Sequence, residues 1–179
     1  MGGEMPNPLK VKKLSQIGIM VKDLEKTMEF YEKTFGVGHW TVFEGETDYC
    51  WYQGCETVVK GRIAMGYAGK VQFELIKTLE GPSIYADFLG EKEEGLHHLG
   101  FFVKDLEARL RACEAMGIKV LQRGVLKQMG MKIDYAYLDT VETGGVIFEF
   151  IQTSFLGINA PQSPGLMKLV SRLQRRFGR

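Results

Sequence analysis

The chain contains two copies of one sequence pattern, and this repeat limits the possible folds more than any other feature. Residues 17–25 read Ile-Gly-Ile-Met-Val-Lys-Asp-Leu-Glu, and residues 99–107, 82 positions later, read Leu-Gly-Phe-Phe-Val-Lys-Asp-Leu-Glu. A second match follows in the same order: residues 71–76 (Val-Gln-Phe-Glu-Leu-Ile) and residues 146–151 (Val-Ile-Phe-Glu-Phe-Ile) lie 75 positions apart. Two separate matches in one order indicate a duplicated structural unit.

Each copy predicts a βαβββ module. Residues 15–22 form a short apolar run rich in Ile and Val, which is typical of a buried strand. Asp23 is a good N-cap for the helix that follows, and Gly36 is a typical residue to end it. By these criteria the first copy has strands at about 15–22, 39–44, 57–66 and 70–77 around a helix at 26–35. The second has strands at about 96–104, 118–124, 132–139 and 145–151 around a helix at 105–116, and a short helix at about 82–90 joins the copies.

These modules predict an α+β fold. A lone βαβββ sheet has one face covered by its helix and one face bare, so two tandem modules can form a curled mixed sheet around a cavity. We therefore expect one domain over residues 13–153, with modules at about 13–78 and 95–153. Residues 154–179 form a C-terminal extension, in which 164–178 has the pattern of a basic amphipathic helix suited to docking or dimerisation.

Composition excludes several classes of partner. With 23 basic and 22 acidic residues the net charge is +1, so no nucleic-acid or membrane partner is expected. The three cysteines, an odd count without a C-x-x-C pair, indicate free thiols in a reducing compartment. The sequence has no pattern of a secretory signal or a membrane span, and we expect a cytoplasmic protein.

Polar residues occupy equivalent positions in the two copies. Gln16 and His98 each precede the first match, and Glu74 and Glu149 stand at the same place in the second. A carboxylate among apolar strand neighbours is costly unless it is paired or bound to a metal. Since the two copies enclose one cavity, we expect these four side chains to form a site for a divalent ion such as Mn, Co, Ni or Zn, with positions left for a substrate.

Simpler interpretations exist for the same residues. His98 could be a satisfied core histidine, and Glu74 could be a solvated residue of an alternating strand. His97 should face away from His98 because neighbouring strand residues point to opposite faces, and His39 has no partner nearby in the sequence. The aromatic run 49–52 fits a pocket wall and ordinary core equally well.

Over about residues 13–153 the chain resembles a known superfamily. The residues that carry the likeness are Gln16–Val21 with Asp23–Glu25, Phe30–Lys33, Pro82–Ile84 with Phe88–Leu89, Glu94–His98 and Gly144–Phe150. They resemble the vicinal oxygen chelate superfamily, which includes glyoxalase I, extradiol dioxygenases, bleomycin-binding proteins and methylmalonyl-CoA epimerase. The closest likeness is to the epimerase.

The resemblance implies a ligand set and a reaction. It places the metal ligands at Gln16, Glu74, His98 and Glu149, although epimerases usually have histidine at the first position and glutamine there is similar to some glyoxalase I enzymes. It implies a divalent-metal-dependent isomerase that abstracts an α-proton through a metal-stabilised enediolate, with Glu149 and Glu74 as the acid–base groups. The substrate would be an acyl-CoA or a similar carbonyl compound, and the chain would form a homodimer.

Two alternatives remain open: a glyoxalase I-like lyase, and a metal-free small-molecule-binding protein of the bleomycin-resistance kind. The extradiol dioxygenase pattern needs two histidine ligands and is not favoured. Met20 and Glu94 stand where glyoxalase I has arginines for glutathione, so glutathione recognition is not expected. Some bacterial epimerases add a second carboxylate on the strand before the second ligand, and the nearest position here is around Arg62.

Overall fold

The computed structural model describes residues 9, 11–91, 94–128, 130–159 and 165. The first module comprises β1 (Gln16–Met20), α1 (Leu24–Phe35), β2 (Gly38–Glu46), β5 (Lys60–Ala68) and β6 (Val71–Glu80). The second comprises β7 (Gly95–Phe102), α3 (Leu106–Ala115), β8 (Val120–Gln128), β9 (Met131–Leu138) and β10 (Ile147–Phe155). Additional elements are β3 (Tyr49–Tyr52), β4 (Cys55–Thr57), α2 (Ile84–Glu91), α4 (Val141–Gly144) and β11 (Ile158–Asn159).

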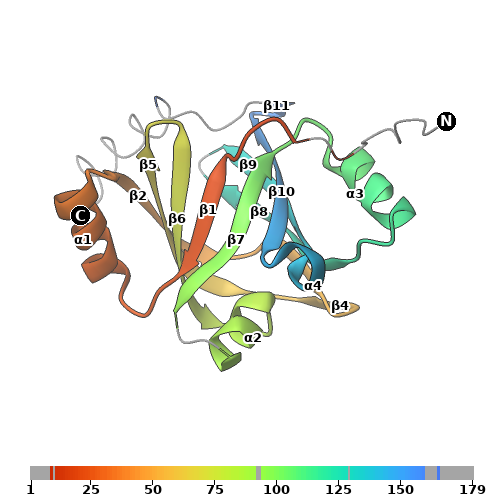
Figure 1. Cartoon of the computed structure of the whole chain (residues 1–179), viewed down its shortest axis with the longest axis horizontal. Helices are drawn as coiled ribbons and strands as arrows, with labels where there is room; N and C mark the ends of the chain where they lie inside the picture. The colour runs from red at the N-terminus through yellow and green to blue at the C-terminus, as the bar shows by residue number, and fades with distance from the viewer. Residues whose placement is uncertain (1–8, 10, 92–93, 129, 160–164, 166–179) are drawn as a thin grey trace.

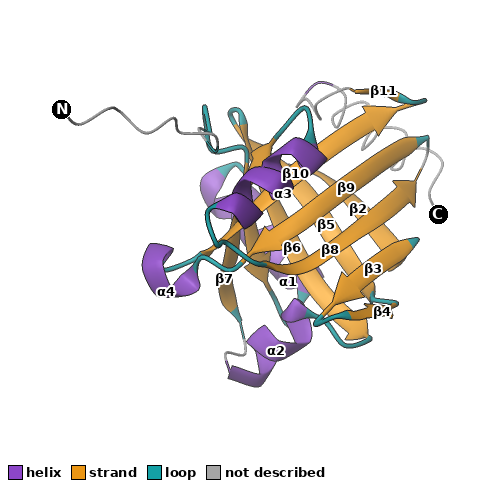
Figure 2. Ribbon diagram, turned by 90° about the vertical axis from the view of Figure 1, so that its right-hand side faces the viewer, coloured by secondary structure: helices purple, strands orange, loops and turns teal. Residues whose placement is uncertain are grey.

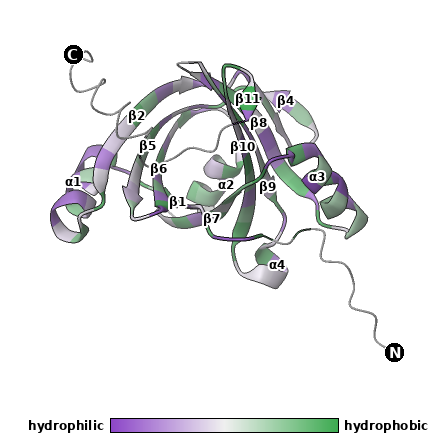
Figure 3. Cartoon of the chain, turned by 90° about the horizontal axis from the view of Figure 1, so that it is seen from above, coloured by the Kyte–Doolittle hydropathy of each residue, from purple (hydrophilic) through white to green (hydrophobic). Residues whose placement is uncertain are grey.

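The two modules join into one mixed sheet with the strand order β2-β5-β6-β1-β7-β10-β9-β8-β3-β4, and β11 pairs with β10. The antiparallel pair β1–β7 lies at the centre, and the parallel pairs β1–β6 and β7–β10 flank it (Figure 1). Seen from above, the sheet curves strongly, with β2 and β8 toward its two ends (Figure 3). This confirms the predicted α+β class and the curled sheet of two βαβββ modules.

Each module carries its long helix on the outside of the curve. The two helices begin alike, because Asp23 accepts a hydrogen bond from the Lys26 amide and Asp105 accepts one from the Ala108 amide, both at 2.9 Å. The predicted N-cap at Asp23 is therefore confirmed. Helix α1 ends at Gly36, which has φ of 68°, a left-handed conformation that glycine adopts without strain.

Separate apolar clusters lie beneath these helices, and a further cluster fills the inside of the curve. The cluster under α1 includes Leu24 and Leu75, and the cluster under α3 includes Leu110 and Phe150. The inner cluster is completed by α2, the helix that joins the modules. This helix lies below the strands in the view of Figure 1, and its Tyr85 belongs to the inner cluster.

A hairpin that the sequence did not predict connects the two ends of the curve. Strands β3 and β4 interrupt the connection between β2 and β5, and β3 pairs with β8 of the second module (Figure 2). The amide of Asp48 donates to the Val125 carbonyl at 3.0 Å, so the crossing begins two residues after β2 ends. Cys50 and Tyr52 belong to the inner core cluster, which assigns this half of the aromatic run to the core.

Among the described residues no helix is long and apolar enough to cross a membrane. The amphipathic helix predicted for 164–178 lies outside the described residues apart from Gly165.

Candidate metal centre

Two glycines on the central strand pair make room for two polar side chains. Gln16 lies opposite Gly100 and His98 lies opposite Gly18 in the β1–β7 register. A Cβ atom at Gly18 would lie 1.9 Å from His98 Cε1, and one at Gly100 would lie 2.7 Å from Gln16 Oε1. Each polar side chain therefore extends across the glycine of the opposite strand. The duplicated glycines, part of the repeat itself, explain why both strands can do this.

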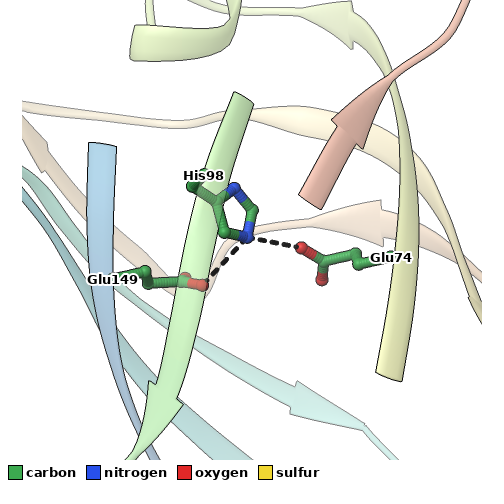
Figure 4. A group of neighbouring side chains, drawn as sticks. All are labelled: Glu74, His98 and Glu149. Carbon is green, nitrogen blue, oxygen red and sulfur yellow. Dashed lines mark ion pairs between the residues drawn. The ribbon is translucent and has the colours of Figure 1, made fainter. Parts of the chain in front are cut away.

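The structure brings together all four residues predicted for the site. His98 Nε2 lies 3.1 Å from Glu149 Oε2, 3.4 Å from Glu74 Oε2 and 3.3 Å from Gln16 Oε1. Glu74 comes from β6 and Glu149 from β10, and they approach the imidazole from opposite sides (Figure 4). All four side chains are buried. Glu74 is only 7% exposed, so its interpretation as a solvated strand residue is wrong.

The buried charges shift one another's protonation. Burial alone would lower the pKa of His98, but the charges and hydrogen bonds of Glu149 and Glu74 outweigh it and raise that pKa to about 9. Burial raises the pKa of Glu149, and the charge of His98 opposes this rise. The cluster without a bound ion therefore holds a protonated imidazole between two glutamates at neutral pH.

The donor atoms suit a divalent cation. Ligand atoms of Glu74, His98 and Glu149 all lie within 4.8 Å of one another. Glu149 Oε2 is buried, and apart from its ion pair with His98 Nε2 at 3.1 Å it has no hydrogen-bond partner among the described residues, so a cation bound beside it would compensate its charge. Two carboxylates, an imidazole and the amide oxygen of Gln16 form a set that suits Mn, Co, Ni or Zn.

His97 also lies at the cluster, contrary to the expectation from strand alternation. The β1–β7 register shifts between Gly18 and Ile19, so that Ile19 pairs with Leu96 and His97 is the extra residue of a bulge. His97 is buried, and its Nδ1 lies 2.9 Å from Nδ1 of His98. Burial and the charge of His98 lower its pKa to about 3, so His97 is neutral. The expectation that it faces away from His98 is wrong because of this bulge.

Gln72 supports the opposite side of the cluster. The Gln16 side-chain amide donates to Gln72 Oε1 at 2.8 Å, and the Gln72 amide donates to the Tyr67 hydroxyl at 2.8 Å. Gln72 is fully buried. The sequence did contain a signal for it, since the alternation of the strand places Gln72 and Glu74 on one face.

An apolar chamber lies next to the cluster. A space of about 30 Å³ beside Gln16, Glu74 and Glu149 adjoins a chamber of about 180 Å³, because the two share lining residues. The shared residues are Ile63, Met65, Tyr85, Leu126, Ile133 and Tyr135. The charged residues that line the chamber, namely Glu44, Glu46 and Lys127, are all exposed and mark its rim. The sequence did not reveal these chamber residues, which come from distant segments.

The other residues considered in the sequence lie away from the cluster. Arg62 forms ion pairs with Glu25 at 2.7 Å and Glu44 at 2.9 Å. Met20 is buried in the core, and Glu94 accepts a hydrogen bond from the Lys22 amide at 2.7 Å. No second carboxylate enters the chamber from the position of Arg62.

Paired βαβββ modules that share a buried donor set at their central strands define a glyoxalase-like class of protein. The family model of the Glyoxalase/Bleomycin resistance protein/Dioxygenase superfamily matches residues 15–137. The chain belongs to this superfamily.

Known proteins similar to this chain include an uncharacterised protein and two epimerases. YqjC of Bacillus subtilis (strain 168), an uncharacterised protein, is 29% identical over 145 residues, which are 79% of this chain and 93% of YqjC. The structure of methylmalonyl-CoA epimerase from Mycobacterium tuberculosis has a TM-score of 0.57 at 23% identity, over 83% of this chain and 91% of the epimerase. A variant of Streptomyces coelicolor methylmalonyl-CoA epimerase in complex with 2-nitronate-propionyl-CoA has a TM-score of 0.57 at 21% identity, over 85% and 100% of the two chains. At these identities the structural likeness shows a shared fold.

Proposed function

We propose that this protein is a divalent-metal-dependent isomerase of the methylmalonyl-CoA epimerase type, which removes and returns a proton next to a carbonyl group. The observation that carries the proposal is the buried group of Glu74, His98 and Glu149 next to an apolar chamber. Buried ionisable groups whose charges shift each other's pKa, as those of His98 and Glu149 do, are typical of proton-transfer sites.

Gln16, Glu74, His98 and Glu149 would hold the ion, and Co, Ni, Zn or Mn fits their donor atoms. A divalent ion bound there would stabilise the negative charge that develops on the substrate oxygens when the α-proton leaves. We expect such a substrate to lie in the chamber, because the chamber and the space beside the donors share lining residues.

Proton transfer falls to the two glutamates. The raised pKa of Glu149 brings this carboxylate closer to neutrality, which suits a group that must both accept and release a proton. Glu74 approaches from the opposite side of His98 (Figure 4). Inversion at a carbon requires groups on both faces of the substrate, and two glutamates from two modules supply them.

The chamber favours a carbonyl substrate with an apolar portion, such as an acyl thioester. Its inner lining includes Ile63, Leu126 and Ile133, and the exposed charges lie at the rim. Such a lining excludes water from the reacting atoms. The complex of the similar Streptomyces epimerase contains a propionyl-CoA derivative, and this supports an acyl-CoA substrate here.

A glyoxalase I-like lyase is the second candidate, and Gln16 favours it. Its amide oxygen points to the cluster, so the donor set is Gln, Glu, His and Glu rather than one that begins with histidine. Glutathione is not the expected thiol, because Met20 is buried in the core and Glu94 is bonded to the Lys22 amide. A metal-free binding protein would use the same chamber without proton transfer.

An exchange experiment separates these functions. We would load the protein with Co²⁺ and incubate it in D₂O with methylmalonyl-CoA, or with methylglyoxal and a panel of thiols. The proposal predicts deuterium at the α-carbon of methylmalonyl-CoA, at least 100-fold less of it with Glu149→Gln, and no change with Glu142→Gln, an exposed carboxylate. Full exchange by Glu149→Gln would contradict its role as the base, and turnover of methylglyoxal alone would favour the lyase.

A further inference from the structure

We propose that Gln72 and His97 are positioning residues of the metal centre, each of which fixes the donor atom of one ligand. The inference rests on the proposed metal site and goes beyond its ligand set. It concerns side chains one contact away from the four donors.

Gln72 determines which end of the Gln16 amide faces the cluster. A glutamine presents either an oxygen or an NH₂ group, and only the oxygen can bind a cation. Gln16 Nε2 donates to Gln72 Oε1 at 2.8 Å, which turns Gln16 Oε1 toward His98 Nε2. Both ends of the Gln72 amide are bonded, because its Nε2 donates to the Tyr67 hydroxyl at 2.8 Å. The hydrogen bonds from Tyr67 to Gln16 thus hold the Gln16 side chain with its oxygen toward the site.

His97 determines which nitrogen of His98 is available. Nδ1 of His97 lies 2.9 Å from Nδ1 of His98, so it can accept a hydrogen bond from a proton on that nitrogen. That hydrogen bond fixes the His98 proton on Nδ1 and leaves Nε2, the nitrogen beside both glutamates, as the metal-binding atom. The rings of Tyr85, Phe88 and Tyr137 surround His97 and hold its orientation.

Duplication of the module does not explain these two supports. The repeat places Ile147 at the position equivalent to Gln72, and Ile147 has no polar side-chain atom. It places Ser15 at the position equivalent to His97, and the Ser15 hydroxyl accepts a hydrogen bond from the Phe102 amide at 3.3 Å. Each support therefore matches the ligand it touches: an amide holds the amide ligand, and an imidazole holds the imidazole ligand.

The test measures Co²⁺ affinity of the full chain rather than turnover. Gln72→Leu and His97→Phe keep the approximate size of the side chains and remove the hydrogen bonds. Loss of such a support typically weakens metal binding about 10- to 100-fold. Tyr67→Phe, which removes a single oxygen, is the milder variant if Gln72→Leu does not fold, and it should weaken Co²⁺ binding in the same direction.

Matched controls separate positioning from general destabilisation. Gln122 is also a fully buried glutamine, and it accepts a hydrogen bond from the Ile84 amide at 3.0 Å. Gln122→Leu therefore measures the effect of losing a buried, hydrogen-bonded glutamine that does not contact Gln16. His97→Gln offers an oxygen in place of the imidazole nitrogen and should restore part of the affinity lost in His97→Phe. In Zn²⁺-loaded protein, ¹⁵N NMR should show a protected Nδ1–H of His98 that disappears in His97→Phe.

We predict that Gln72→Leu and His97→Phe each lose Co²⁺ affinity about 10- to 100-fold and show an altered Co²⁺ visible spectrum. In Gln122→Leu both the affinity and the spectrum should stay as in the wild type. Equal affinities in Gln72→Leu and Gln122→Leu, or a retained His98 Nδ1–H signal in His97→Phe, would overturn the inference. These readouts are independent of catalysis. Wild-type protein that binds Co²⁺ with this pattern but exchanges no α-proton would refute the proposed reaction and leave the positioning roles supported.

Discussion

Gly18 and His98 face each other across the central strand pair, and the imidazole occupies the space that a side chain at position 18 would need. The distance from a Cβ at Gly18 to His98 Cε1 would be 1.9 Å, far below any contact between real atoms. The ring cannot yield easily, because it is fully buried beside Tyr137 and His97. The glycine of one module therefore provides the space that the histidine of the other occupies.

Gly18→Ala should displace His98 and disable the site. Overpacking of this kind typically costs about 1–3 kcal/mol in the free energy of unfolding. We expect a lower melting temperature and Co²⁺ binding weakened more than tenfold, measured by calorimetry. Gly45→Ala is the matched control, because a Cβ there meets nothing within 4 Å. Unchanged Co²⁺ affinity in Gly18→Ala would show that His98 does not need this position.

The two adjacent histidines should make the metal-free protein less stable to unfolding at both alkaline and acidic pH. The pKa of His98 is raised from 6.5 to about 9, so its contribution to stability is full below pH 6.5 and is lost as the pH rises through 9. The pKa of His97 is lowered to about 3, so its contribution is present above pH 6.5 and is lost as the pH falls toward 3. Urea unfolding of protein treated with a chelator should show both decreases in the free energy of unfolding.

Single substitutions show which histidine causes each loss of stability. His98→Gln should remove the loss of stability between pH 6.5 and 9, and His97→Phe should remove the part of the acid loss that belongs to His97. If the alkaline limb of the unfolding curve were identical in His98→Gln and wild type, the protonated imidazole would not be its cause.

Metal binding should release a proton. An ion must replace the Nε2 proton that His98 carries below about pH 9 in the metal-free protein. The apparent Co²⁺ affinity should therefore rise about tenfold per pH unit between pH 6.5 and 8.5. Calorimetry in buffers of different ionisation enthalpy counts the released protons, and a count of zero would mean that His98 is already deprotonated.

Narrowing the chamber should separate substrate binding from metal binding. Ile133 lines both the chamber and the space beside the cluster. Ile133→Phe should raise the KM for an acyl thioester, or abolish its α-proton exchange, while Co²⁺ affinity stays within about twofold, because the donors are untouched. Ile158→Phe on the exposed β11 is the control. Exchange at the wild-type rate by Ile133→Phe would place the substrate elsewhere.

The sequence predicted the modules, and it indicated four polar residues that the structure places together, because repetition carries long-range information. An offset between two copies says which positions are equivalent, and the equivalence of Gln16 with His98 and of Glu74 with Glu149 identified the cluster that the structure assembles. Local patterns supplied the helix start at Asp23.

Features that depend on pairing between distant strands could not be predicted in this way. The β3–β4 hairpin joins β8 from another module, and no local periodicity specifies that partner. The bulge that turns His97 toward His98 is a shift of one residue in register, and alternation predicts the opposite orientation. Tyr85 and Tyr135 meet at the chamber from segments 50 residues apart, and their common role is visible only in the fold.

The most direct test of the proposed metal centre is the stoichiometry of Co²⁺ binding in wild-type protein and in one ligand variant of each module. Titration followed by visible absorption should give one ion per chain, and both Glu74→Gln and Glu149→Gln should lose this binding although each leaves the other module intact. Absence of stoichiometric Co²⁺ binding by the wild type, or full binding by either variant, would contradict a site built jointly by the two modules.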